Sequence, residues 1–396
     1  MTEGLSVDEL RELDARYAMR TYLRAGVEFV RGEGARLWDS SGKEYLDFFA
    51  GLSVHNAGHC HPRIVEAIQR QAATFAGSSN LFLSAPALRL SRRLSESSLG
   101  GRVFLANTGT EASEGAIKIA RKHAHRRGVE TPEIISLDSD FHGRTLGALA
   151  ATPKLADEER FGPLPRGFRY VPRDDAEALR AAASENTAAV FFELIQGEAG
   201  VWPIPAEVIE AARQVCDETG ALLIFDEVQT GMGRTGTLWA YQGVGVEPDV
   251  ITAAKALGGG LPVGAIIAGE RASDVLEPGD HGSTFAGGPI QASAALAALD
   301  VLSDEALLAS VRELGERLMG GLREIDGIVD VRGRGLMVGV SLTEGIDAAA
   351  VRDRCLEAGL VLNCPGPGML RLLPPLIIEA ADVDRALEII AASVRG

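Results

Sequence analysis

The chain has 396 residues, 46% of them hydrophobic, which predicts a globular protein with a large core and about two domains. Its formal net charge is −16 and its basic residues are scattered, so the composition argues against a nucleic-acid-binding protein. No apolar run approaches the length of a membrane span, and residues 1–4 do not begin a secretory leader, so we expect a cytoplasmic protein without membrane contact.

The first 55 residues contain a helical opening and a turn at Gly32-Glu33-Gly34, which is too little for an independent core. We therefore expect residues 1–55 to pack on the C-terminal part of the chain or on a second subunit.

A histidine cluster follows this segment, and a metal site is one interpretation of it. However, His59-Cys60-His61-Pro62 has no second pair of ligands nearby, so the entry to a helix is the better interpretation and we expect no metal. The cysteines are widely spaced and form no CxxC pair, which favours buried thiols: Cys60, Cys216, Cys355 and Cys364.

Short β-rich runs alternate with helical patterns between residues 102 and 268. Continuous apolar strands separated by helices predict an α/β fold with a mostly parallel sheet that is covered on both faces. Ligands of such sheets bind at the carboxyl ends of the strands. The predicted strands are residues 102–106, 133–137, 189–192, 222–225 and 250–252.

Asn107-Thr108-Gly109-Thr110-Glu111 follows the first of these strands and precedes a predicted helix over residues 111–125. A Gly-Thr turn at a helix N-terminus offers backbone N–H groups, a hydroxyl and the positive end of the helix dipole, which suit a phosphate. The alternative is an ordinary N-cap with Thr110 as the capping residue.

Phe141 and Arg144 follow the second strand. Phe141 could stack on a heteroaromatic ring and Arg144 could hold a carboxylate, although, taken separately, a residue like Phe141 is more often core and one like Arg144 more often surface. Glu198, in Gln196-Gly197-Glu198, is a candidate partner for a buried cation. The alternative is that Glu198 is an ordinary acidic residue of a loop.

Asp226 ends the strand at residues 222–225, where a buried carboxylate needs a partner such as a protonated pyridine nitrogen. An N-cap or a structural salt bridge is the alternative. The string at residues 231–236 looks like GxGxxG but opens no helix, so a dinucleotide site is not expected.

Lys255 is one of five lysines, and it alone lies between an apolar run, residues 250–254, and a glycine turn, residues 258–260. An amine in apolar surroundings has a depressed pKa, so a neutral nucleophile becomes available near pH 7. This pattern indicates Schiff-base chemistry with a carbonyl.

After Pro289 the pattern changes to long helical periodicity as far as Ile325, then short strands near residues 328–332 and 336–342, a helix, a strand and a final helix from Asp382. This predicts a smaller α+β domain. Arg371 is the one charge in an apolar strand and needs an anion there, either a buried Glu or a substrate carboxylate.

Taken together, these motifs are similar to those of the class III, or ω-, aminotransferases, which are fold type I pyridoxal-phosphate enzymes. The resemblance covers nearly the whole chain and implies a large cofactor-binding domain at residues 56–288, a small C-terminal domain at residues 289–396, and a segment 1–55 packed on the small domain and on a partner. It rests on residues 29–34, 58–62, 107–111, 141–145, 195–198, 223–236, 254–260 and 370–376.

The resemblance implies a role for each cofactor-binding residue. Lys255 would bond to pyridoxal 5'-phosphate and shuttle a proton, Asp226 would pair with the pyridinium nitrogen, and Gln229 would contact the phenolic oxygen. Phe141 would stack on the ring. The phosphate would be held by Gly109 and Thr110, and by Thr284 of the neighbouring subunit, so a homodimer is implied.

Four residues are implied for the substrate. Arg371 would bind the α-carboxylate of glutamate and 2-oxoglutarate, and Glu198 would neutralise Arg371 when an ω-amine is bound. Arg144 would take the far carboxylate, and Tyr22 would line the pocket. This chain departs from the family at Thr108, Leu194 and Gly288, and Gly288, which replaces the usual Asn before the Pro, affects the loop near the dimer interface.

The nearest resemblance is to the acetylornithine and ornithine aminotransferase subgroup. It implies transfer of the δ-amino group of N2-acetyl-L-ornithine to 2-oxoglutarate, in arginine biosynthesis. The alternatives are another ω-amine donor, namely ornithine, succinylornithine, succinyldiaminopimelate, 4-aminobutyrate or carrier-linked lysine. A decarboxylating or aminomutase relative, or a non-enzymatic scaffold of the same fold, is the remaining alternative.

Overall fold

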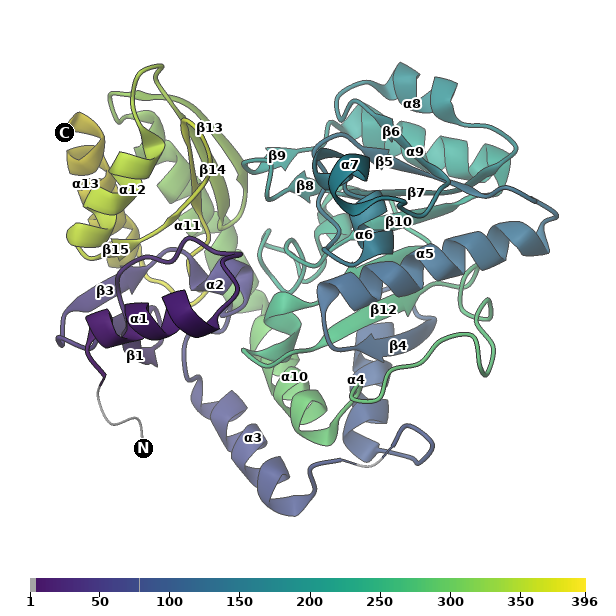
Figure 1. Cartoon of the computed structure of the whole chain (residues 1–396), viewed down its shortest axis with the longest axis horizontal. Helices are drawn as coiled ribbons and strands as arrows, with labels where there is room; N and C mark the ends of the chain where they lie inside the picture. The colour runs from purple at the N-terminus through teal and green to yellow at the C-terminus, as the bar shows by residue number, and fades with distance from the viewer. Residues whose placement is uncertain (1–4, 78) are drawn as a thin grey trace.

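The computed structural model describes residues 5–77 and 79–396 (Figure 1). The expectation about residues 1–4 lies outside the described residues. Figure 1 shows a large central sheet with its helices on one side of the molecule, and a smaller set of strands and helices from both ends of the chain on the other.

The central sheet has seven strands and is mostly parallel, which confirms the predicted α/β fold. The exception is the strand β12, which runs antiparallel to both of its neighbours, β11 and β4. In spatial order the strands are β4 (Arg102–Ala106), β12 (Gly264–Ala268), β11 (Val250–Ala253), β10 (Leu222–Asp226), β7 (Thr187–Glu193), β5 (Glu133–Leu137) and β6 (Phe168–Val171).

Both faces of this sheet are buried, because successive side chains of a strand point to opposite faces. In β10, Leu223 and Phe225 belong to one core cluster, while Leu222 and Ile224 belong to another. Helix α5 (Gly109–Arg126) supplies apolar side chains to the second cluster. On the other face lie α9 (Ala206–Thr219), α4 (Ala85–Glu96) and α10 (Pro289–Leu302).

A second sheet lies in the C-terminal part, in the order β13 (Ile328–Arg334), β14 (Met337–Leu342), β17 (Met369–Leu372) and β16 (Asn363–Gly366). The predicted helical run from Pro289 to Ile325 is two helices, because Ser303 ends α10 and Asp304 caps the next helix. That helix is α11 (Glu305–Arg323), followed by α12 (Ala348–Glu357) and α13 (Ala380–Arg395).

The N-terminal segment joins the C-terminal part through a third sheet. Its strand β3 (Glu44–Asp47) pairs in parallel with β15 (Leu360–Val361). The remaining strands of this sheet are β1 (Phe29–Glu33) and β2 (Arg36–Asp39), with helix α1 (Val7–Tyr17) ahead of them. Helix α3 (Pro62–Thr74) begins at Pro62, as the sequence predicts, and packs on α10.

Shorter elements complete the chain between these parts. They are α2 (Ala50–Ser53), α6 (Leu146–Ala150), α7 (Glu158–Phe161), α8 (Ala176–Ala182), β8 (Ile195–Gln196), β9 (Trp202–Pro203) and the 3-10 helices η1 (Pro153–Leu155), η2 (Ala240–Gly243) and η3 (Lys255–Gly258).

Arg234, from the glycine-rich string, holds three parts of the chain together. Its fully buried guanidinium donates to the side chains of Ser53 and Asn56 and to the backbone carbonyls of Leu336 and Pro374, at 2.5–3.0 Å. Burial lowers the pKa of Arg234 to about 9. The string therefore connects the N-terminal, central and C-terminal parts.

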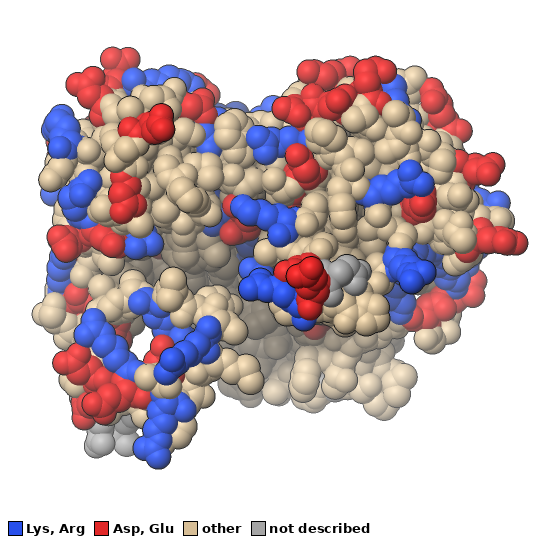
Figure 2. Space-filling view, turned by 45° about the horizontal axis from the view of Figure 1, so that its top comes forward, with Lys and Arg blue, Asp and Glu red and all other residues tan. Residues whose placement is uncertain are grey.

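The face shown in Figure 2 is hollowed between two lobes, and basic and acidic side chains are interspersed over it. Across residues 5–77 and 79–396, the longest and most apolar helices fall short of what a membrane crossing requires.

Candidate active site

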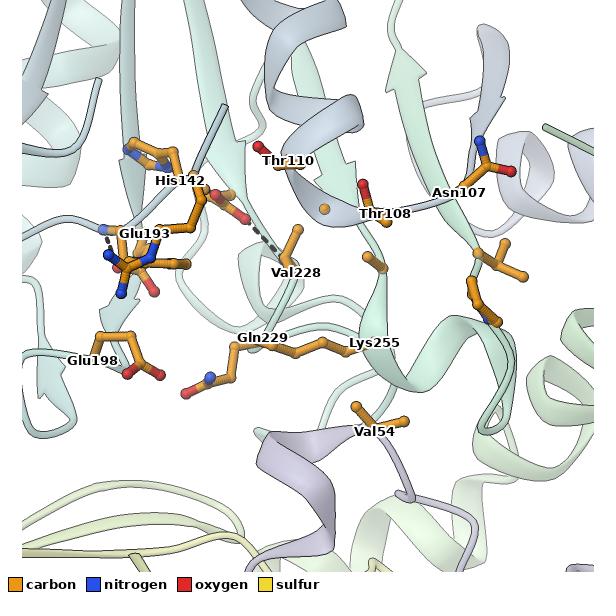
Figure 3. Close-up of a pocket in the computed structure, with 18 of the residues that line it drawn as sticks. Val54, Asn107, Thr108, Thr110, His142, Glu193, Glu198, Val228, Gln229 and Lys255 are labelled. Carbon is orange, nitrogen blue, oxygen red and sulfur yellow. Dashed lines mark hydrogen bonds and ion pairs between the residues drawn. The ribbon is translucent and has the colours of Figure 1, made fainter. Parts of the chain in front are cut away.

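A cavity of about 420 Å³ lies at the carboxyl ends of the central strands (Figure 3). Its walls come from the loops that follow β4, β5, β10 and β11, together with residues at or after the end of β7. This is where the sequence predicts a ligand for a parallel sheet. The cavity brings together Gly109, Thr110, Phe141, Arg144, Glu198, Asp226, Gln229 and Lys255.

Lys255 follows β11 and begins η3 in a left-handed conformation, with φ of 48°. This conformation is uncommon for a residue with a side chain and is found where the surrounding structure imposes it. Burial lowers the pKa of the Lys255 amine, and this effect outweighs the attraction of the carboxylates of Glu198 and Glu193. The cavity therefore contains an amine that loses its proton more easily than an exposed lysine.

Asp226 ends β10 with its carboxylate at the cavity wall, only 3% exposed. One oxygen, Oδ2, accepts a hydrogen bond from Nδ1 of His142 at 2.7 Å, and Oδ1 accepts from the N–H of Val228 at 3.0 Å. Both carboxylate oxygens therefore have a hydrogen-bond donor. An anion in this position can pair with a protonated ring nitrogen of a ligand.

His142 is the cation behind Asp226, and the sequence did not identify it. Burial alone would lower its pKa, but the carboxylates of Asp140 and Asp226 outweigh burial and raise the pKa of His142 to about 10. The imidazole also stacks on Phe191, with 3.9 Å between ring centroids. The sequence does place a histidine next to Phe141 at the end of a strand. It does not show that the histidine contacts Asp226, which is 84 positions away.

Helix α5 begins at the other end of the cavity. Its N-cap is Thr108, whose hydroxyl accepts from the N–H of Glu111 at 3.3 Å, so the alternative with Thr110 as the cap is wrong. The Thr110 hydroxyl instead lies 2.8 Å from that of Thr145. A Cβ on Gly109 would lie 2.9 Å from Val228, so a side chain would crowd this turn. The N–H groups of Gly109 and Thr110, at the start of the helix, have no acceptor within the helix and can donate to an anion.

These groups fit the cofactor that the sequence implies. A phosphate suits the first turn of α5, a carboxylate at Asp226 suits a pyridinium nitrogen, and the amine of Lys255 suits an aldehyde. The cavity is large enough for the ring, and Phe141 lies in its wall. The donor set therefore matches pyridoxal 5'-phosphate in charge and in kind.

Arg371 is 1% exposed and is paired with Glu198: its Nη1 lies 2.8 Å from Oε1 of the carboxylate. The guanidinium also donates to Oδ1 of Asn363 at 2.8 and 3.2 Å and to Oε1 of Gln229 at 3.3 Å. Burial opposes the ionisation of Glu198, but Arg371 outweighs burial and lowers the pKa of Glu198. Of the two anions that the sequence allows for Arg371, the structure contains a glutamate, Glu198, although its side chain is 37% exposed rather than fully buried.

Arg144 is exposed at the cavity mouth, 5.5 Å from the centroid of the Phe141 ring. Within the described residues it makes no hydrogen bond or ion pair. Arg144 is therefore free to hold an anionic ligand group.

Three of the expected residues do not line this cavity. Arg371 lies behind its wall, in contact with Glu198 and Gln229, which do line it. Tyr22 is 74% exposed and lies near Arg24, 5.8 Å from ring centroid to guanidinium carbon. Thr284 lines a separate hollow with Asn80 and Gln291. A role for Thr284 in this cavity therefore requires a second copy of the chain.

Glu193 is a further residue that the sequence did not identify. It ends β7, lines the cavity and is 5% exposed. Burial, and then the nearby carboxylates of Asp140 and Asp226, raise its pKa to about 8. Its position at the end of an apolar strand is the same signal that indicated Asp226.

Comparison with known proteins gives a match to the family model described as aminotransferase class-III over residues 17–394. The chain is 45% identical to the acetylornithine aminotransferase of Caldanaerobacter subterraneus subsp. tengcongensis, over 95% of this chain and 97% of that protein. It is 46% identical to the acetylornithine aminotransferase of Streptomyces coelicolor, over 94% and 92%. A structure of the ornithine aminotransferase from Toxoplasma gondii, which reveals partial occupancy of PLP at the active site, has a TM-score of 0.94 and 35% identity, over 98% and 94%.

Proposed function

The chain belongs to the class III aminotransferases, which are pyridoxal-phosphate enzymes, and on that basis we propose that it transfers the δ-amino group of N2-acetyl-L-ornithine to 2-oxoglutarate. The products are N-acetyl-L-glutamate 5-semialdehyde and L-glutamate, so the donor carbon loses an amine and the keto acid gains it. Support comes from relatives named acetylornithine aminotransferases that are 42–46% identical over nearly the whole chain.

The observation that carries this proposal is the ion pair between Arg371 and Glu198, the latter of which lines the cavity. One cavity has to accept a dicarboxylate, which needs Arg371, and then an ω-amine, which leaves Arg371 without a ligand anion. An unpaired buried guanidinium is costly in free energy. A carboxylate of the protein that pairs with Arg371 while the ω-amine is bound therefore lets the same cavity bind both substrates.

Pyridoxal 5'-phosphate, when bound, supplies the electron sink for the transfer. We propose that Lys255 holds the cofactor and that its Nζ moves the proton between the substrate carbon and the cofactor. Asp226, supported by His142, would keep the ring nitrogen protonated, and Gln229 would contact the phenolic oxygen. Phe141 would stack on the ring, and Gly109 and Thr110 would hold the phosphate.

Arg144 would bind the carboxylate that lies farthest from the reacting carbon. Its freedom from other anions and its place at the cavity mouth support this role. An acetylated donor retains that carboxylate, while its α-nitrogen carries no charge.

We also propose a cytoplasmic homodimer in which Thr284 of one subunit completes the phosphate site of the other. Large apolar side chains are exposed beside the hollow that contains Thr284, and covering them is favourable. Leu81, Phe82, Leu83 and Phe285 are 70–92% exposed.

A panel of amino donors assayed with 2-oxoglutarate tests the proposed substrate. We expect the highest kcat/KM for N2-acetyl-L-ornithine among acetylornithine, succinylornithine, ornithine and 4-aminobutyrate. A clear preference for a donor without an acyl group would overturn the proposal.

Free ornithine is the second candidate donor, because the Toxoplasma gondii ornithine aminotransferase superposes with a TM-score of 0.94. The same panel separates the two, since ornithine has a second, charged amine that the acetyl group removes.

A further inference from the structure

Glu193 occupies a junction between two loops of the active site. One loop follows β5 and carries Phe141 and Arg144, and the other follows β8 and carries Glu198. Figure 3 shows Glu193 and Glu198 on the same side of the cavity.

The carboxylate of Glu193 accepts one hydrogen bond from each loop. Its Oε2 accepts from the N–H of Phe141 at 2.9 Å, and its Oε1 accepts from the N–H of Gly197 at 3.2 Å. Both bonds are buried or nearly so, and breaking either would leave a backbone N–H without its partner. A single side chain therefore connects the two loops.

Asp140 makes the reciprocal connection. Its Oδ1 accepts from the N–H of Glu193 at 3.3 Å and from Nε2 of Gln196 at 3.0 Å. We call Asp140 and Glu193 the carboxylate clasp. The clasp fixes the start of the loop that carries Glu198 relative to the loop that carries Phe141.

Gly197 is also closely packed on the side that faces away from Glu193. A Cβ on Gly197 would lie 2.0 Å from Oε1 of Gln229, the same oxygen that accepts from Nη1 of Arg371. Gly197 is therefore confined between Glu193 and Gln229, and the next residue, Glu198, meets Arg371.

We propose that Glu193 is a positioning residue for substrate exchange: by holding Gly197 it keeps Glu198 on Arg371 and thereby sets the balance between dicarboxylate and ω-amine binding. This inference rests on the proposed function, in which a dicarboxylate must displace Glu198 from Arg371. When Gly197 is released, the ion pair opens more easily. A dicarboxylate then binds more tightly, and an amino donor, which needs Arg371 neutralised, binds more weakly.

Glu193→Gln tests the proposal, because a carboxamide replaces one of the two acceptor oxygens with an NH2 donor, which cannot accept a hydrogen bond from the N–H that it faces. The connection between the loops is broken whichever bond remains. Binding of glutarate, an unreactive dicarboxylate of the same chain length as 2-oxoglutarate, is measured by calorimetry at about pH 9, above the pKa of about 8 of Glu193, so that its carboxyl group is ionised. We expect its Kd to fall about fivefold and the KM of the amino donor to rise by about the same factor, as expected for the loss of one hydrogen bond.

Glu227→Gln is the matched control. Glu227 is also a buried carboxylate that accepts two backbone hydrogen bonds, from the N–H groups of Ala240 at 2.6 Å and Tyr241 at 2.8 Å, but it does not line the cavity. General loss of stability affects both variants. Opposite shifts for the two ligands are expected for Glu193→Gln alone.

A double variant with Glu198→Gln locates the effect. If Glu193 acts through Glu198, adding Glu193→Gln to Glu198→Gln changes the glutarate Kd no further. Equal changes for both ligands, no change, or the same shift in Glu227→Gln would overturn the proposal. If Glu193→Gln does not fold, Glu193→Asp, which is too short to reach both loops, is judged by the same results.

The calorimetric result does not depend on turnover. If acetylornithine proves not to be the donor, the proposed function fails while the glutarate shift still stands. If the donor panel succeeds and the glutarate shift is absent, only the role of Glu193 is refuted.

Discussion

Nη1 of Arg371 lies 2.8 Å from Oε1 of Glu198, although the two residues are 173 positions apart in the sequence. Arg371 is held in β17 of the smaller sheet and Glu198 in a loop after β8. The pair therefore joins the smaller sheet to a loop of the central part of the molecule.

Glu198→Gln removes the internal anion and keeps the size of the side chain. We expect the KM for the amino donor to rise about tenfold, because Arg371 stays buried without an anion, and the KM for 2-oxoglutarate to fall, because no ion pair has to open. Steady-state kinetics with each substrate varied in turn gives both values. Glu207→Gln, an exposed acid in α9, is the control that should leave both unchanged.

Asp226→Asn removes the anion that His142 supports and that we assign to the pyridinium nitrogen. We expect kcat to fall by about 100-fold or more, the size of effect typical for a lost preorganised electrostatic contact. The absorption spectrum of the protein with added cofactor reports whether the cofactor still binds. A nearly normal kcat in the Asp226→Asn variant would refute the assignment.

His142 makes stability depend on pH. Its pKa is raised to about 10 in the folded protein, against about 6.5 in an unfolded chain, so its contribution is complete below pH 6.5 and is lost as the pH rises through 10. We therefore expect the free energy of unfolding of the wild type to approach that of His142→Asn between pH 6.5 and 10. Urea unfolding across this range measures the difference, and a constant difference would contradict the account.

Arg234→Met tests the junction of the three parts of the chain. The carbonyls of Leu336 and Pro374 lose their donor, so we expect a loss of about 2–5 kcal/mol in the free energy of unfolding. Arg317→Met removes a half-exposed ion pair with Asp384 and should cost much less stability than Arg234→Met, because solvent screens such a pair. Equal losses in the two variants would contradict the role of Arg234.

Local patterns in the sequence predicted five of the seven strands of the central sheet and several cavity residues, but they missed β6 and β12. Runs of apolar, β-branched residues predicted strands, and the first polar residue marked the end of each strand. Asp226 ends β10 in this way, and Lys255 follows β11. Because carboxyl ends of parallel strands share one edge, their convergence in one cavity could be predicted from the order of elements alone.

Contacts between distant segments could not be predicted in the same way. The partner of His142 depends on how β5 and β10 are spaced in the sheet, and the clasp of Asp140 and Glu193 depends on two loops that meet only in the fold. Thr108 rather than Thr110 caps α5 because Thr108 has extended backbone angles, which composition does not reveal. Tyr22 was expected in the pocket, but the described chain leaves it exposed.

The most direct test of the account is the covalent site of the cofactor. The protein is incubated with pyridoxal 5'-phosphate and reduced with borohydride, and its peptides are analysed by mass spectrometry. We predict that the mass added by the reduced cofactor is found on the peptide that contains Lys255 and is missing in Lys255→Ala. Added mass on another lysine alone, or none in the wild type, would contradict the assignment of Lys255 and the function built on it.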